Sequence, residues 1–139
     1  MNNINISDIK EIQLKRYSDT KGNLIAIENL KDIPFEIKRV FYVYDANGQT
    51  RGKHAHYQTK QVLICVSGEC TVVCRDGKQA REITLSNPEH AVLIPEMIWN
   101  EITYHSSGSV LLVLSNTPYN TFDYINNWQE YVSLQESKK

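Results

Sequence analysis

The sequence of 139 residues has almost no net charge, few cysteines and no long apolar run. Its 15 basic and 16 acidic residues are scattered and sum to a formal net charge of −1, which gives no electrostatic case for binding nucleic acid or an anionic membrane surface. No segment approaches the roughly 18 consecutive apolar residues of a membrane span, and the N-terminus has no signal-peptide core. We therefore expect a cytoplasmic protein with no membrane partner and no nucleic-acid partner.

The three cysteines, Cys65, Cys70 and Cys74, are odd in number, lie in apolar runs and have no CxxC spacing. This usage is typical of buried free thiols in a reducing cytoplasm. The chain also has no internal repeat, low-complexity tract or linker. Its length suits one domain, residues 1–139, with a core large enough to be stable without disulfides or a structural metal.

Between about residues 35 and 117, short runs rich in β-branched and aromatic residues alternate with turn residues. The runs cover residues 40–44, 62–66, 70–74, 81–85, 91–94, 99–104 and 110–114. Glycine, proline and asparagine separate them at intervals of about 8–12 residues, and Asp76-Gly77 between two runs is a strong hairpin signal. Many short strands at regular spacing predict an all-β sandwich or barrel.

The two ends of the chain depart from this pattern. Residues 1–34 predict one or two further strands around Gly22-Asn23, with an apolar run at 24–27. Near the C-terminus, apolar side chains recur at helical spacing, at Phe122, Ile125, Trp128 and Val132. This period predicts a short amphipathic helix over about residues 122–136.

The run Arg51-Gly52-Lys53-His54-Ala55-His56 contains half of the four histidines. Strand side chains alternate between the two faces of a sheet, so His54 and His56 are expected on the same face. The pair is either part of a metal site or two acid/base groups aimed at a ligand, because imidazole ligates metals and also changes its charge near neutral pH. A third interpretation stays open, in which both side chains only form hydrogen bonds inside the barrel.

A His-x-His pair on a strand of a small β-barrel resembles the cupin superfamily, whose first motif is Gly-x5-His-x-His-x4-Glu-x6-Gly. Four positions of that motif match here, at Gly48, His54, His56 and Gly68. The glutamate position is Gln61. The histidine of the second cupin motif, five residues after Pro95, is Asn100. A neutral amide is a poor substitute for carboxylate or imidazole toward a transition metal, so the resemblance implies a cupin-type jelly roll without a metal in its site.

Further runs extend this resemblance over nearly the whole chain. They are residues 33–40, 51–56 and 61–63, with supporting similarity at 82–85, 99–101 and 123–125. Together they look like the sugar-nucleotide 3,4-ketoisomerases, which act on dTDP-4-keto-6-deoxyglucose, and the Arg-Gly-x-His-Ala-His run is the most specific. Two departures are Asn100, where some relatives have histidine, and Asn126, where a basic residue often follows the Asp-Tyr-Ile run.

The resemblance implies an isomerase that needs no cofactor and binds a dTDP-linked 4-keto-6-deoxy sugar. Moving a carbonyl from C4 to C3 requires removal of the C3 proton and delivery of a proton to C4, and His54 and His56 are the catalytic candidates for these transfers. The expected substrate-binding residues are Arg39, Tyr42, Arg51, Gln61, Trp99 and Asn100. The two arginines are assigned to the diphosphate, because the guanidinium fork matches phosphate oxygens.

Two of these residues have further expected roles. Tyr42 is expected to contact a substrate hydroxyl or relay a proton, and Trp99 to stack on thymine or sugar unless it only packs in the core. The resemblance also implies a homodimer that exchanges its N-terminal strands, within about residues 1–34. Such an exchange would cover the apolar run at 24–27.

Three other functions stay open on the sequence alone. Epimerisation of the same keto sugar at C3, or at C3 and C5, begins with the same proton removal but leaves the carbonyl at C4. A non-catalytic sugar-nucleotide-binding barrel and a metal-dependent oxygenase are the other two. The sequence also leaves open which histidine removes the C3 proton and which stereochemistry results at C4.

Overall fold

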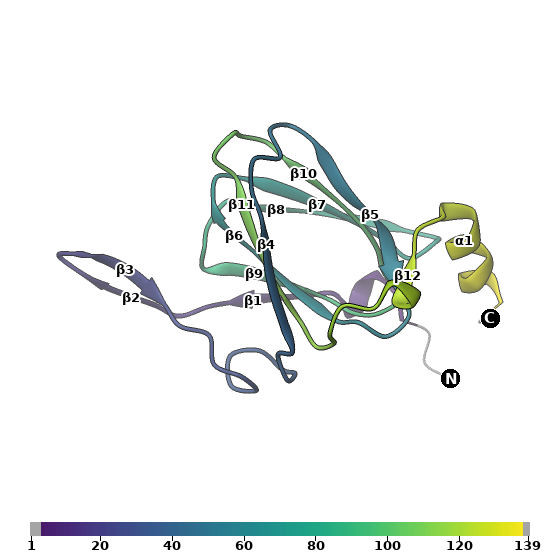
Figure 1. Ribbon diagram of the computed structural model, residues 1–139, viewed down its shortest axis with the longest axis horizontal. Coiled ribbons are helices and arrows are strands. Elements are labelled where there is room, and N and C mark those ends of the chain that lie inside the picture. The colour runs from purple at the N-terminus through teal and green to yellow at the C-terminus, as the bar shows by residue number, and fades with distance from the viewer. Residues whose placement is uncertain (1–3, 138–139) are drawn as a thin grey trace.

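Two five-stranded antiparallel sheets form the body of the protein (Figure 1), whose computed structural model describes residues 4–137. The first sheet has the order β1 (Lys10–Gln13), β9 (His90–Ile94), β6 (Gln61–Ser67), β11 (Val110–Ser115), β4 (Arg39–Val43). The second has the order β12 (Tyr124–Ile125), β5 (Thr50–His56), β10 (Trp99–Tyr104), β7 (Cys70–Arg75), β8 (Ala80–Leu85). The prediction of an all-β fold is confirmed.

The main core lies between these sheets and follows the two-residue period of the strands. Strand β7 shows it most clearly, because Cys70, Val72 and Cys74 are fully buried while the residues between them are half-buried. From the first sheet, Leu63 and Cys65 of β6 pack into the same cluster. All three cysteines are buried free thiols, as their usage predicts.

The N-terminal arm covers the outer face of the first sheet. After the 3-10 turn η1 (Ile6–Asp8), the arm forms β1 and then the hairpin of β2 (Arg16–Asp19) and β3 (Gly22–Ile25). Leu14, Ile33 and Phe35 are buried against β6 and β9 in a second apolar cluster. The hairpin itself projects away from the body at the left of Figure 1.

The C-terminal helix is shorter than the sequence period predicts. Residues 121–123 form the 3-10 turn η2 (Thr121–Asp123), strand β12 follows, and helix α1 runs only over Trp128–Glu136. The helix begins where the Asn127 side chain accepts a hydrogen bond from the backbone N–H of Glu130, which is an N-cap. The prediction of helix over 122–127 is wrong because this segment instead pairs with β5, and its Phe122 is 90% exposed.

Helix α1 closes the outer face of the second sheet. The ring of Tyr131 is fully buried, and its hydroxyl lies 2.9 and 2.8 Å from the carbonyl oxygens of Arg75 and Met97. Ala55, Trp99 and Met97 belong to the same cluster beneath the helix. None of the helices in residues 4–137 is long and apolar enough to cross a membrane.

Candidate active site

A cavity of about 590 Å³ opens between the two sheets beside strand β5. Six of the residues that the sequence predicts for the site line it: Arg39, Tyr42, Arg51, His54, Gln61 and Asn100. They come from β4, β5, β6 and β10, so segments far apart in the chain meet there. His56 lies directly behind His54, with the two imidazole centroids 4.9 Å apart.

A bulge in β5 brings Arg51 and His54 into the same cavity. Asn100 of β10 pairs with His54, and Glu101 pairs with Gly52, so Lys53 has no partner on β10. Side chains three positions apart on a regular strand point to opposite faces. The extra residue shifts this phase, and Arg51 pairs with the cavity-lining Ile102.

Glycine is required at the first position of this bulge. Gly52 has φ +86°, in the left-handed region that side chains disfavour. A Cβ atom there would lie 3.1 Å from the carbonyl oxygen of Asn100 and 3.3 Å from its side-chain oxygen. Both constraints explain the Arg-Gly-Lys sequence ahead of the histidines, because only glycine allows the close approach to β10.

The two histidines face the cavity side of β5, as strand alternation predicts. Ala55 between them points to the opposite face and is fully buried under α1. The imidazole planes stand at 81° to each other, and the ring of Tyr124 lies 4.9 Å from that of His54 and 4.6 Å from that of His56. The three rings therefore form one mutually packed group.

Burial keeps both imidazoles uncharged near neutral pH. It lowers the pKa of His56 to about 4, with repulsion from His54 and Arg39 adding to burial and Asp123 opposing it. The pKa of His54 is also lowered by burial, while a hydrogen bond to the Gly52 backbone opposes the shift. Neutral imidazoles accept protons, so the pair is in the state that a general base requires.

Arg39 lies beside the cavity with its guanidinium against two aromatic rings. Its guanidinium carbon lies 4.5 Å from the ring centroid of Phe41 and 4.8 Å from that of Tyr119. Neither Arg39 nor Arg51 forms a salt bridge within residues 4–137, whereas Lys60 pairs with Glu96. Two cations without carboxylate partners in one cavity are suited to an anionic ligand.

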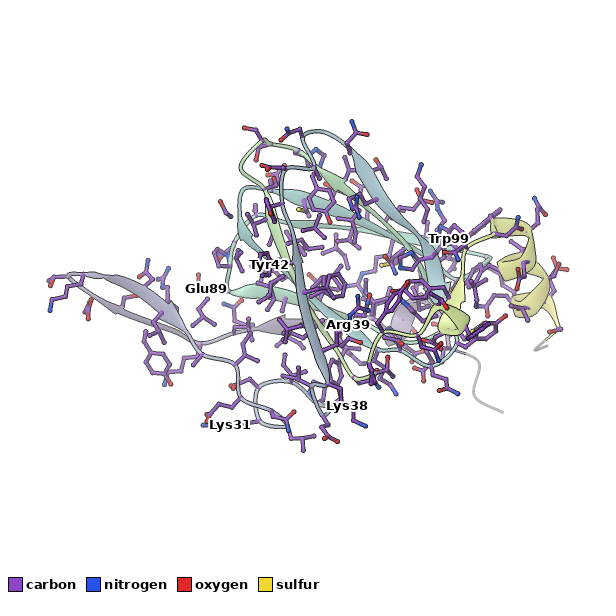
Figure 2. All side chains as sticks on the ribbon, viewed as in Figure 1. Lys31, Lys38, Arg39, Tyr42, Glu89 and Trp99 are labelled. Atoms are coloured by element: carbon purple, nitrogen blue, oxygen red, sulfur yellow. The ribbon has the colours of Figure 1, made fainter. Side chains whose placement is uncertain are left out.

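Trp99 lies on the side of helix α1, whereas Tyr42 lies along β4 with Arg39 (Figure 2). Trp99 precedes cavity-lining Asn100 on β10, so its side chain takes the opposite face, where it is 4% exposed and packs on Trp128 and Tyr131. Its position does not support stacking on a ligand, and packing explains it. Tyr42 reaches the rim of the cavity from β4 with a largely exposed ring.

The residues at the cupin ligand positions offer a poor metal site. Gln61 and Asn100 are buried and line the cavity with His54, so the donors are imidazoles and neutral amides. In the described part of the chain, no three His, Cys, Asp or Glu side chains are grouped to hold a metal ion.

Comparison with known proteins places the chain in a family. A family model described as FdtA: WxcM-like, C-terminal, matches residues 7–136. The TDP-4-oxo-6-deoxy-α-D-glucose-3,4-oxoisomerase of Aneurinibacillus thermoaerophilus is 41% identical over 128 residues, which are 89% of this chain and 92% of that protein. The chain belongs to the FdtA family.

Solved structures of relatives agree with the FdtA assignment. A 3,4-ketoisomerase from Helicobacter canadensis has 40% sequence identity and a TM-score of 0.90, covering 93% of this chain and 98% of that one. QdtA, a sugar 3,4-ketoisomerase from Thermoanaerobacterium thermosaccharolyticum solved with TDP, has 34% identity and a TM-score of 0.92, covering 96% and 98%. The resemblance to sugar-nucleotide 3,4-ketoisomerases is confirmed, and with it the cupin-like fold.

One wall of the FdtA-family cavity was not among the predicted site residues. It comes from the segment between β11 and α1, which contributes Tyr119, Thr121, Tyr124 and Asn126. Half of this segment, residues 122–127, lies where the helical period predicts helix. The Asp-Tyr-Ile run at 123–125 could have pointed to this wall, because it is part of the resemblance to the ketoisomerases although no role was assigned to it.

Proposed function

We propose that this FdtA-family chain is a sugar-nucleotide 3,4-ketoisomerase that converts dTDP-4-keto-6-deoxyglucose to its 3-keto isomer. The observation that carries the proposal is that His54, packed against His56, lines one cavity with Arg39 and Arg51. The names of its relatives support the same substrate class. QdtA is solved with TDP, and a mutant of it with TDP-4-keto-6-deoxyglucose.

The reaction requires only proton transfers. The C4 ketone acidifies the C3 proton, and its removal by a base forms an enediolate, whose C4 oxygen takes up a proton to give the enediol across C3 and C4. A proton then adds to C4, the C3 oxygen loses its proton, and the carbonyl stands at C3. Hydrogen-bond donors near the sugar oxygens stabilise the charge that develops on them. Asn100 and Gln61 supply amide donors on the cavity wall.

The division of labour between the histidines follows from their positions. His54 lines the cavity and is half-buried, whereas His56 lies behind it and is 4% exposed. A general base must reach the proton that it removes. We assign the proton transfer at C3 to His54, with His56 packed against it as its neighbour.

The fate of deuterium tests the proposed reaction. We expect dTDP-4-keto-6-deoxyglucose, incubated with the protein in heavy water, to give a product whose carbonyl is at C3 and whose C4 carries deuterium. Proton NMR of the product reads both features. Deuterium at C3 or C5 with the ketone still at C4 identifies an epimerase and refutes the isomerase. Binding of the substrate with no conversion supports a non-catalytic barrel.

Arg39 is assigned to the diphosphate, and its removal is expected to weaken TDP binding. Losing a charged hydrogen-bond donor costs roughly 1.5–3 kcal/mol, so the Arg39→Gln variant should raise the Kd for TDP about 10–100-fold in titration calorimetry. Arg75→Gln is the matched control, because Arg75 pairs with Glu101 outside the cavity. Equal affinities of the two variants for TDP would refute the assignment.

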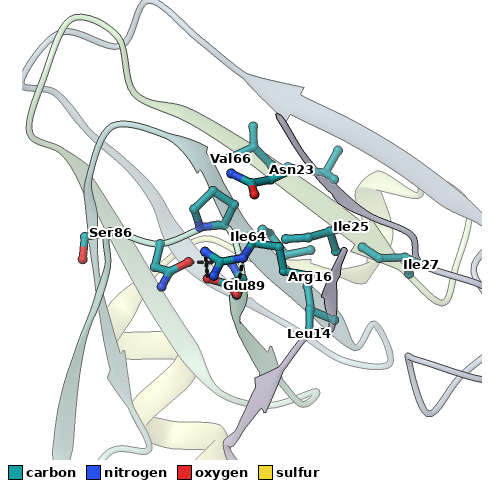
Figure 3. A pocket seen from close by; sticks show the side chains of 12 residues that line it. Leu14, Arg16, Asn23, Ile25, Ile27, Ile64, Val66, Ser86 and Glu89 are labelled. Atoms are coloured by element: carbon teal, nitrogen blue, oxygen red, sulfur yellow. Dashed lines mark hydrogen bonds and ion pairs between the residues drawn. The ribbon is translucent and has the colours of Figure 1, made fainter. Parts of the chain in front are cut away.

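A homodimer is proposed from the groove beneath the hairpin (Figure 3). This groove of about 690 Å³ has an apolar floor that includes Ile25 and Ile64, and Arg16 pairs with Glu89 at its side. The β2–β3 hairpin beside it leaves Leu24 exposed. The N-terminal arm of a second copy could pack on this groove, because the arm carries apolar side chains such as Leu14, Ile25 and Ile27.

Size-exclusion chromatography with light scattering tests the dimer. We expect the wild-type protein to elute at twice the chain mass and the Val66→Arg variant to dissociate, since Val66 lines the groove and is exposed. Tyr57→Arg is the control, because Tyr57 is exposed to a similar extent and lies outside both the groove and the N-terminal arm. A monomeric wild-type protein would overturn the proposal.

A further inference from the structure

Tyr124 is the one ring in the described chain that packs on both imidazoles. Its centroid lies 4.9 Å from His54 with planes at 71°, and 4.6 Å from His56 with planes at 58°. These distances fall within the range of about 4.5–7 Å that favours edge-to-face aromatic pairs. The ring therefore contacts both members of the pair and restricts the rotation of each.

The backbone around Tyr124 is held firmly in place. Tyr124 pairs with His56 and Ile125 with Ala55 in the short ladder of β12 and β5. Ile125 is buried in the cluster beneath α1. These contacts fix the backbone on both sides of the ring.

Asp123 anchors the same segment from the other direction. Its carboxylate accepts backbone hydrogen bonds from Gln58, at 2.9 Å, and from Thr59, at 3.2 Å. The Thr59 hydroxyl also donates to it. The loop that follows the histidines and the segment that carries Tyr124 are thus tied together.

We propose that Tyr124 is a positioning residue, whose ring sets the orientation of the His54–His56 pair and excludes water from it. Its importance for catalysis rests on the proposed function, in which this pair transfers the protons. The aromatic ring rather than the hydroxyl carries the effect. Within residues 4–137 the Tyr124 hydroxyl forms no hydrogen bond to a protein group, while the ring forms both contacts.

Other charges near the pair come from several elements. Arg39 on β4 and Asp123 on η2 act on His56 with opposite signs. Arg51 on β5, Tyr104 on β10 and Tyr119 line the cavity that His54 faces. None of these groups is altered when Tyr124 is replaced, so a change in imidazole titration reports the loss of the ring. Burial is the largest cause of both lowered histidine pKa values, and removing the ring admits water.

Two substitutions separate the ring from the hydroxyl. In Tyr124→Phe the ring is kept, and we expect kcat within about threefold of wild type and unchanged imidazole titration. In Tyr124→Leu we expect both imidazole pKa values to rise toward about 6.5 by at least half a unit. The acidic limb of the kcat–pH profile should move to higher pH by the same amount. We also expect kcat at pH 8 to fall about tenfold, while the Kd for TDP stays unchanged.

The titration is measured by NMR on protein labelled with ¹⁵N-histidine, with signals assigned through His54→Asn and His56→Asn. Tyr119→Leu is the matched control, because the Tyr119 ring lies 5.9 Å from Tyr124 and stacks on Arg39. It should weaken TDP binding and leave the titration of His54 in place, because burial and the Gly52 backbone, not Arg39, set the pKa of His54. If the leucine variant at 124 fails to fold, Tyr124→Met replaces it.

Each outcome decides the proposal. A phenylalanine variant as inactive as the leucine variant would overturn it, since the hydroxyl would then be essential. Unchanged titration in the leucine variant would overturn it too. If the wild-type protein does not isomerise the keto sugar, the proposed function fails, but the NMR titration still shows whether the ring controls the imidazoles.

Discussion

Replacing His54 with asparagine is expected to lower kcat for ketoisomerisation by about 10²–10⁴-fold, the range that a lost general acid/base group produces. Asparagine keeps a polar side chain of similar reach but accepts no proton near neutral pH. The arginines of the cavity remain, so the Kd for TDP should stay within about threefold of wild type. Steady-state kinetics and titration calorimetry measure the two effects separately.

The matched variants are His56→Asn and His90→Asn. His56 is expected to matter less than His54, because it lies behind it and does not line the cavity. His90 forms a hydrogen bond with Glu11 at the far edge of the first sheet, and the His90→Asn variant should keep the kcat of the wild type. A larger loss in His56→Asn than in His54→Asn would reverse the assignment, and nearly full activity in both would remove the pair from the mechanism.

Replacing Gly52 with alanine is expected to damage both binding and turnover. The new Cβ would meet Asn100 at 3.1 Å on a backbone with φ +86°, so the β5 bulge must shift. A displacement of about 1 Å at a reacting group costs on the order of 10²-fold in rate. We expect kcat to fall about 100-fold and the Kd for TDP to rise about tenfold, because Arg51 and His54 lie on either side of the bulge.

Gly48→Ala is the control for backbone strain. Gly48 also has a left-handed backbone, with φ +76°, but a Cβ there meets nothing within 4 Å. Both variants should lose thermal stability, since alanine is disfavoured at positive φ. Only the Gly52 variant should lose activity beyond that. If equal losses of kcat appear in both, general strain and not the bulge explains the effect.

Local patterns in the sequence predict much of this structure. The two-residue period identifies the strands of the barrel and puts His54 and His56 on one face, because alternation depends only on neighbouring residues. The helical period over 122–136 succeeds from Trp128 onward and fails before it. There the pairing of Tyr124 and Ile125 with β5, more than 60 positions away, outweighs the local helical spacing.

The cavity itself depends on pairing between distant strands. Regular strand alternation would put Arg51 and His54 on opposite faces of β5. Only the register of β10 against β5 reveals the bulge that brings both side chains to the cavity. The position of Trp99 also depends on the sheet. Asn100, Ile102 and Tyr104 of β10 line the cavity, so the Trp99 side chain takes the opposite face.

The sequence by itself determined the all-β fold, the paired histidines and the missing metal ligands at Gln61 and Asn100. Only the tertiary structure decided that Tyr124 packs on both imidazoles and that Arg39 stacks between Phe41 and Tyr119. The reason is physical: alternation is a local property of one strand, whereas ring packing and burial depend on segments that meet only after the sheets have closed.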